Sequence, residues 1–157
     1  MQTIRKILIG VGAAALLATI PAPGRQSSTS GVRMVRPKDV RWQDVAGYPA
    51  GYQRAVLEGK MDSHVPITYR VRLAAHFRFM PHTHPWDEHV TVLKGTWCLG
   101  LGKSFDEKQM EALETGSFII IPSGVPHYVM TREGETIAQV HGIGPTSVTY
   151  VTPGDQP

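Results

Sequence analysis

The sequence predicts an all-β fold in a single domain. Several short segments are rich in β-branched and aromatic residues, and glycine or proline turn signals separate them at intervals typical of sandwiches and barrels. The chain has 157 residues, a length that suits one domain with a sizeable core. Hydrophobic residues make up 41% of it and charged residues 18%, a balance typical of a folded globular protein. We therefore expect a jelly roll of short strands.

Seven segments are the expected strands, and most of their residues favour extended structure. They are residues 67–74, 89–93, 96–101, 117–121, 127–131, 136–141 and 147–151. Turn signals such as Lys94-Gly95 and Gly144-Pro145 lie between them. Residues 106–113 are the one candidate for a helix, and they are short and polar enough to form a loop turn instead.

The beginning of the chain has the pattern of an export signal. A basic start with Arg5 and Lys6 runs into an uncharged apolar stretch over residues 7–20. That stretch is shorter than the roughly 20 residues that a membrane-spanning helix needs, so we expect no stable membrane anchor. Residues 1–24 are therefore predicted to be a signal peptide whose cleavage position is uncertain, and the protein to be periplasmic or secreted.

The remaining chain divides into an arm, a barrel and a tail. Residues 25–60 begin with a small, polar stretch typical of a flexible linker and continue with an arm whose aromatic and turn residues indicate one or two strands. The barrel is expected over residues 61–152, and residues 153–157 form the tail.

Charge and cysteine content limit the possible partners and cross-links. Sixteen Lys and Arg against thirteen Asp and Glu give a formal net charge of +3, which falls close to neutral once residues 1–24 are removed. No cluster of Lys and Arg remains that would bind phosphates, so we expect no nucleic-acid partner. The single Cys98 cannot form an internal disulfide, and packing must therefore stabilise the fold.

Three polar side chains in the middle of the chain are spaced to meet on one face of a strand. His82, His84 and Glu88 have the same parity, so in an extended chain they point to the same side. Pro81 and Pro85 cannot donate a hydrogen bond to a neighbouring strand, which places this stretch where strand pairing is interrupted. We expect that interruption at the mouth of the barrel, where a ligand can enter.

Two motifs in the sequence resemble those of the cupin superfamily, and together they cover residues 76–131. The residues that carry the resemblance are His82, His84, Glu88 and Gly95 in the first motif, and Gly116, Pro122, Gly124 and His127 in the second. The resemblance implies the cupin double-stranded β-helix, which is a jelly-roll barrel. His76 stands where the first motif usually begins with glycine, and Thr131 stands where the second often ends with asparagine. Glycine at that first place serves a turn with positive φ, which histidine tolerates better than a β-branched residue does.

The resemblance also implies a metal site. In cupins, the two His and the Glu of the first motif and the His of the second usually bind one divalent ion, and by position these are His82, His84, Glu88 and His127. Three imidazoles with one carboxylate suit Fe, Mn, Ni, Zn, Co or Cu rather than Ca or Mg. Four protein ligands around an octahedral ion leave two positions for water, oxygen or a chelating substrate.

The function implied by the resemblance is chemistry on a small molecule. We favour a metal-dependent enzyme of the dioxygenase, isomerase or lyase type, with a non-catalytic, metal-stabilised cupin that binds or senses a ligand as the alternative. A third reading is an interaction protein whose metal only stiffens the barrel. Fold alone does not choose among these. Because many small cupins pair through an edge strand or an N-terminal arm, we also expect a homodimer.

Four further residues are candidates for lining the pocket. Trp86 lies between two expected ligands and either caps the cavity or packs on the surface. Trp97 alternates with leucines, which indicates a core position, with stacking against a substrate as the alternative. Gln139 and His141 share one face of a late strand, where they either contact the substrate or form a hydrogen-bonded core pair. His89 points to the opposite side from the ligands and is excluded from the site.

Overall fold

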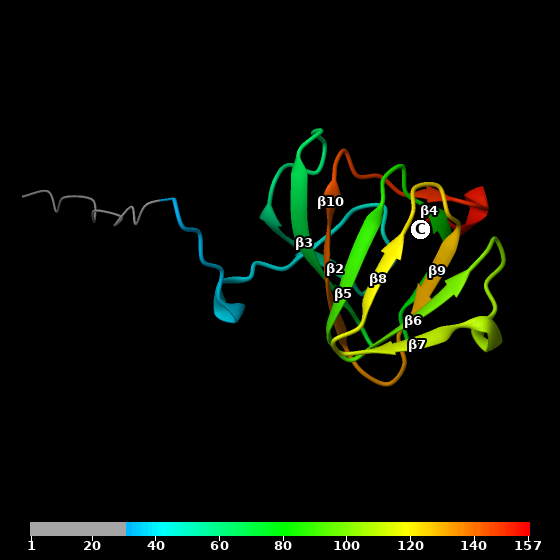
Figure 1. The fold of residues 1–157 in the computed structure, drawn as a ribbon. Helices are drawn as coiled ribbons and strands as arrows, with labels where there is room; N and C mark the ends of the chain where they lie inside the picture. The colour runs from blue at the N-terminus through cyan, green and yellow to red at the C-terminus, as the bar shows by residue number, and fades with distance from the viewer. Residues whose placement is uncertain (1–30) are drawn as a thin grey trace, which may run out of the picture. The chain divides into compact units, whose positions relative to one another are not determined.

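The structure is a computed structural model and describes residues 31–157. Within them, residues 34–157 form one compact unit of two antiparallel sheets with three short 3-10 turns, and residues 31–157 contain no α-helix (Figure 1). The prediction of an all-β fold is thereby confirmed. The expected signal peptide, residues 1–24, lies outside the described residues. Among the residues that are described, no helix is long and apolar enough to cross a membrane.

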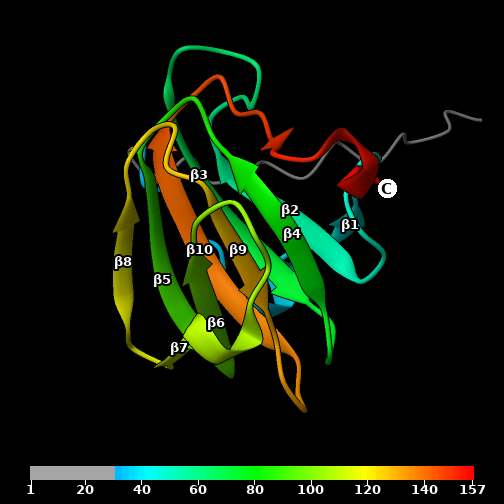
Figure 2. The same cartoon turned by 90° about the vertical axis from the view of Figure 1, so that its right-hand side faces the viewer.

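Two layers of strands make up the unit, and Figures 1 and 2 show them from two sides. The six-stranded sheet has the order β1 (Gln43–Asp44), β2 (Tyr52–Glu58), β3 (Pro66–Leu73), β10 (Thr136–Ile143), β5 (Glu88–Lys94) and β8 (Phe118–Ile121). The five-stranded sheet has the order β11 (Thr149–Tyr150), β4 (Arg78–Thr83), β9 (His127–Met130), β6 (Thr96–Leu101) and β7 (Glu111–Glu114).

The expected strands and the observed strands agree in most of the chain and differ in two places. The arm, residues 25–60, holds β1 and β2 where one or two strands were expected, and β2 pairs with β3 along most of its length, so the six-stranded sheet begins before the expected barrel of residues 61–152. β4 was not expected as a strand. Residues 106–113 form a 3-10 turn, Glu107–Gln109, followed by β7, because Asp106 caps the turn through its side chain and the chain then extends to pair with β6.

The core lies between the two sheets and follows the period of two along each strand. In β3, Ile67, Tyr69, Val71 and Leu73 are buried, and the residues between them are only partly buried. In β10, Ala138 and Val140 are buried next to the same core, while their neighbours face outward. This alternation decides which side chains of the six-stranded sheet can reach the inside of the barrel.

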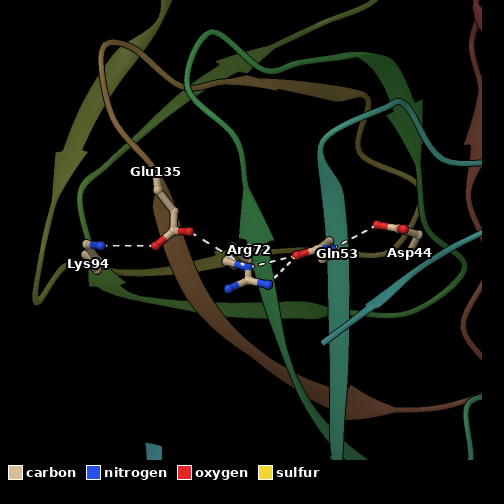
Figure 3. Close-up of polar contacts among 5 residues, drawn as sticks. All are labelled: Asp44, Gln53, Arg72, Lys94 and Glu135. Atoms are coloured by element: carbon tan, nitrogen blue, oxygen red, sulfur yellow. Dashed lines mark hydrogen bonds and ion pairs between the residues drawn. The ribbon is translucent and has the colours of Figure 1, made fainter. Parts of the chain in front are cut away.

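A chain of polar contacts crosses the outer face of the six-stranded sheet (Figure 3). Lys94 Nζ donates to Glu135 Oε1 at 3.0 Å, and Glu135 Oε2 lies 3.8 Å from Arg72 Nε. Arg72 Nε donates to Gln53 Oε1 at 2.9 Å, and Gln53 Nε2 donates to Asp44 Oδ1 at 3.0 Å. The outward-facing Arg72 therefore has both a carboxylate and an amide as partners.

Thr131 fixes the turn that leads into β4. Its Oγ1 accepts a hydrogen bond from the backbone N–H of Phe77 at 2.9 Å and donates one to the carbonyl of Ala74 at 2.6 Å. Between these two positions, His76 has a φ of 57°, as expected at a place where the cupin motif usually has glycine. The fully buried hydroxyl of Thr131 thus holds a strained turn in place.

Pro81 interrupts pairing, as the sequence predicts. The register between β4 and β9 shifts between Phe79 and His82, and regular pairing resumes with His82 opposite His127. This local irregularity brings two of the expected metal ligands next to each other in the ladder.

Candidate metal centre

Three buried histidines converge inside the barrel at one end of the two sheets. His82 belongs to β4, His84 follows the end of that strand, and His127 is the first residue of β9. One ring nitrogen from each lies within 4.8 Å of those of the other two. The ring centroids of His82 and His127 are 4.3 Å apart, and that of His84 lies 5.0 Å from the first and 5.3 Å from the second.

Backbone carbonyl groups orient all three imidazole rings in the same way. The Nδ1 atom of His82 lies 2.7 Å from the carbonyl oxygen of Met80. Nδ1 of His84 lies 2.8 Å from the carbonyl oxygen of Ser147, and Nδ1 of His127 lies 3.0 Å from that of Val125. A carbonyl oxygen only accepts hydrogen bonds, so each Nδ1 carries the proton and each Nε2 keeps a free lone pair. Such carbonyl contacts are typical of histidines that bind metal through the other nitrogen.

Glu88, the first residue of β5, brings a carboxylate from the opposite sheet. Its Oε2 atom lies 3.7 Å from Nε2 of His84 and 3.6 Å from Nε2 of His127. Glu88 thus lies close to two of the three histidines, and it is not part of the group of side chains whose ligand atoms all lie within 4.8 Å of one another. The two sheets supply ligands to the same centre, which places it inside the barrel.

Burial determines the charge state of the cluster. Desolvation lowers the pKa of His82 well below its usual value, and the neighbouring His127 and His84 lower it further. Desolvation also lowers the pKa values of His84 and His127. For Glu88, burial raises the pKa to about 7, while the nearby His127 opposes this shift. Near neutral pH, the cluster therefore presents three uncharged imidazoles and a carboxyl group that loses its proton readily when a cation approaches.

The donor set fits a divalent transition metal. Three free imidazole lone pairs and one carboxylate oxygen are borderline ligands, which favour Zn, Fe, Ni, Co, Cu or Mn over Ca or Mg. The protein also contains no other group of three potential metal-ligating side chains this close together within residues 31–157. Three buried histidines of this protein can therefore bind a metal ion.

Two surface cavities flank the cluster without being lined by it. A cavity of about 740 Å³ lies on the outside of β5 and β10, and Trp86 and His141 line it together with His64 and His89. A second cavity of about 330 Å³ lies between the segments that follow β1 and precede β11. None of the four expected ligands lines either cavity, because their side chains are almost completely buried.

The four candidate lining residues lie in different places. Trp86 is buried, with its ring centroid 5.7 Å from that of His84, and it packs against the backbone of Gly142. His141 faces the outer cavity, where its ring lies 4.9 Å from that of His89. Both residues line a cavity, but this cavity is outside the barrel.

Trp97 and Gln139 line neither of these two cavities. Trp97 is part of the hydrophobic core between the sheets. Gln139 lies on the outer face of β10, where its Oε1 accepts a hydrogen bond from Arg70 Nε at 3.3 Å. It cannot contact a ligand inside the barrel, because the neighbouring Ala138 and Val140 take the inward positions.

Sequence reasoning missed three side chains near the cluster, Tyr48, Arg54 and Tyr150. All three line the 330 Å³ cavity. Tyr150 pairs with His82 in the β11–β4 ladder. Tyr48 packs against Phe79, and the ring centroid of Phe79 lies 3.9 Å from that of His82 in a stacked arrangement. In the sequence, only the shared parity of Arg54 and Tyr52 could have indicated that Arg54 faces the same side as Tyr52. That parity is informative only once β2 is known to be a strand of the barrel.

Comparisons with known proteins agree with the observed architecture. A family model described as the ChrR cupin-like domain matches residues 30–145. No curated protein matches the sequence. Among solved structures, the polyketide cyclase RemF from Streptomyces resistomycificus has a TM-score of 0.66 and 22% identity, over 77% of this chain and 86% of that chain.

Two further solved structures have related folds and different printed activities. A sugar phosphate isomerase from Silicibacter pomeroyi has a TM-score of 0.61 and 17% identity, over 75% of this chain and 81% of that chain. The DMSP lyase DddQ from Ruegeria pomeroyi has a TM-score of 0.57 and 21% identity, over 71% of this chain and 61% of that chain. At such identities the likeness shows the fold alone, since one fold supports many activities.

Proposed function

Because the chain belongs to the cupin superfamily, within its family of ChrR cupin-like domains, we propose that it binds one divalent transition metal ion and acts on a small molecule at that ion. The ligands would be His82, His84, Glu88 and His127. The related folds include proteins described as a cyclase, an isomerase and a lyase, which supports chemistry on a small molecule.

One observation carries the proposal: each of the three histidines has its Nδ1 proton engaged by a backbone carbonyl. As a result, three Nε2 lone pairs and a carboxylate oxygen lie close together among side chains that are almost completely buried. Lone pairs brought this close repel one another, and a cation bound between them removes that repulsion. A core built only for packing gains nothing from such an arrangement.

Each ligand residue has a separate task in this proposal. The three neutral imidazoles fix the position of the ion, and their backbone partners keep the rings from rotating. Glu88 supplies one negative charge and, with a pKa of about 7, can also hold or release a proton near neutral pH. The bound ion would supply Lewis acidity at coordination positions that the protein leaves free.

A non-catalytic role as a metal-stabilised ligand-binding or sensing cupin is the second candidate. Burial of the cluster favours it, since His82 and His127 are each only 1% exposed and line neither the 740 Å³ nor the 330 Å³ cavity. Access to the ion would then require movement of the side chains that cover it.

Turnover separates the two candidates. Metal-loaded protein is incubated with a panel of diketones, flavonoids, uronates and sugar acids, and consumption of oxygen or substrate is followed against the His82→Ala/His127→Ala double variant. Turnover by the wild type that the double variant loses supports the enzyme. A ligand from the panel that binds saturably without forming product supports the binding protein.

Two expectations from the sequence remain proposals. We infer export from the pattern of residues 1–24, which the mass of the mature protein in the exported fraction tests. We also infer a homodimer, which a molar mass measured in solution by light scattering tests directly.

A further inference from the structure

Arg54 is a charged residue on the inward face of the six-stranded sheet. It lies opposite Val71 in the β2–β3 ladder, and Val71 belongs to the hydrophobic core. Of its neighbours of the same parity in β2, Tyr52 is buried, whereas Val56 is opposite the buried Tyr69 but is itself exposed, next to a shift in the β2–β3 register. A cation on the core side of a sheet is costly unless something compensates its charge.

In the described part of the chain, the polar partners of this cation are phenol groups and not carboxylates, since burial raises the pKa values of Tyr48 and Tyr52 and a side-chain hydrogen bond from Arg54 acts to lower them. No ion pair joins Arg54 to a carboxylate within residues 31–157. Its guanidinium carbon lies instead 5.5 Å from the ring centroid of Tyr48 and 5.8 Å from that of Tyr69, at cation–π distances. The outward arginines of β3 differ, since Arg70 has Gln139 as a partner and Arg72 has Gln53 and Glu135.

The guanidinium of Arg54 borders the 330 Å³ cavity beside the metal cluster. Tyr48, Met61, Ser147 and Tyr150 are among the other lining residues. The carbonyl of Ser147 is the one that orients His84, and the ring centroid of Tyr150 lies 6.4 Å from that of His82. One acidic residue, Asp62, also lines the cavity, but its Oδ1 accepts a hydrogen bond from Ser63.

A second polar group at this cavity is the hydroxyl of Tyr150. The Oη atom of Tyr150 is buried and has no hydrogen-bond partner. A phenol hydroxyl buried without a partner costs free energy, and an oxygen acceptor from a ligand would remove that cost. The cavity thus combines a cation without a carboxylate partner, a hydroxyl without a hydrogen bond and the apolar side chains of Met61 and Val148.

We propose that a substrate reaches the metal centre from this neighbouring cavity, by movement of the side chains that separate the two, and that Arg54 binds the carboxylate of a small organic acid in the cavity. Arginine suits this task because its planar guanidinium forms two parallel hydrogen bonds to a carboxylate. The apolar wall accommodates the carbon chain, and Tyr150 Oη donates to an oxygen of the ligand. The proposal rests on the proposed function, because it assigns the substrate class of the same centre.

The test compares dicarboxylic acids with matched monocarboxylic acids. Zn²⁺-loaded wild-type protein is titrated by calorimetry with succinate, glutarate and adipate, and with butyrate, pentanoate and hexanoate as the partners of equal chain length. One carboxylate can reach the ion, and only a diacid offers a second one to Arg54. We expect at least one diacid to bind about tenfold more tightly than its partner, because only the diacid can form a charge-assisted pair with Arg54 while its other carboxylate reaches the ion.

Substitutions of Arg54 test whether this residue causes the preference for diacids over monoacids. Arg54→Gln should abolish the preference for the diacid, and Arg54→Lys should retain part of it, because lysine keeps the charge without the planar fork. Arg70→Gln, on the outer face of the adjacent strand, should retain all of it. Zn²⁺ content and circular dichroism of each variant establish that the fold and the ion are intact.

A parallel titration of metal-free protein separates this proposal from the proposed function. Pentanoate should bind more tightly than the neutral pentanamide, and Arg54→Gln should remove the difference even without an ion. If wild-type protein takes up no Zn²⁺ but this difference persists, the metal proposal fails and the carboxylate site stands. If the wild type does not distinguish diacids from monoacids, or if Arg54→Gln distinguishes them as well as the wild type does, the carboxylate site is wrong.

Discussion

The Oε2 atom of Glu88 lies 3.6 Å from the Nε2 atom of His127, and these two atoms come from opposite sheets of the barrel. Glu88 is the first residue of β5, and His127 is the first residue of β9. The two sheets therefore meet at the beginnings of these two strands. Metal binding at this point would connect the layers where no backbone hydrogen bond can.

Proton release on metal binding should depend on pH in a way that identifies Glu88. The folded, metal-free protein has a pKa of about 7 at this carboxyl, and a bound cation requires its ionised form. Near pH 6, binding should release about one proton, and near pH 8 almost none. Calorimetry of Zn²⁺ binding in two buffers of different ionisation enthalpy measures this number. Glu88→Gln should release far less at pH 6, and equal release by both proteins would contradict the assignment.

The same carboxyl should destabilise the metal-free protein as pH rises. Its pKa is 4.5 in the unfolded chain and about 7 in the folded protein, so the unfolded chain loses its proton first. Stability due to this group therefore falls between about pH 4.5 and pH 7 and stays low above that range. Glu88→Gln should gain up to about 3 kcal/mol relative to the wild type at pH 8. Urea unfolding of the chelator-treated proteins at pH 5 and pH 8 gives the comparison, and a constant difference would refute the shift.

Thr131→Val should destabilise the fold although it keeps the shape of the side chain. The substitution removes the hydroxyl that bonds both the N–H of Phe77 and the carbonyl of Ala74 in a fully buried position. We expect a loss of about 1–3 kcal/mol in the free energy of unfolding. Thr91→Val on the outer face of β5 is the control and should change stability by less than about 0.5 kcal/mol. Equal effects of the two substitutions would show that the turn does not depend on Thr131.

Gly142→Ala should disturb the wall between the outer cavity and the cluster. A Cβ atom at this position would lie 2.3 Å from the ring of Trp86, which in turn packs beside His84. Overpacking of this kind costs about 1–3 kcal/mol, and the displaced ring should also weaken metal binding through His84. Gly134→Ala is the control, because its Cβ would meet no atom within 4 Å. Normal stability and metal affinity of Gly142→Ala would mean that Trp86 is free to move.

Much of the site could be predicted because its signals are local in the sequence. The parity of His82, His84 and Glu88 predicts a shared face, and the resemblance to cupin motifs adds His127. Pro81 predicts the irregular pairing, which the β4–β9 register shows. The positive φ of His76 also follows from its place in the motif.

The parts that sequence reasoning missed depend on contacts between distant segments. From the sequence Arg54 is expected to be an ordinary surface residue, and only the pairing of β2 with β3 shows that it lies opposite the buried Val71. Gln139 and His141 share a face, but only the burial of Ala138 and Val140 shows that this face is the outer one. β7 was missed because four residues with three polar or small side chains carry no strand pattern without β6 as a partner.

Metal content tests the central claim most directly. Protein purified without added metal, or after incubation with Zn²⁺ and removal of the excess, is subjected to elemental analysis beside the His82→Ala/His127→Ala double variant. We predict about one transition metal ion per chain in the wild type and almost none in the double variant, since two of four ligands are then missing. A wild type that holds no transition metal under either condition, or a double variant that holds as much as the wild type, would contradict the account.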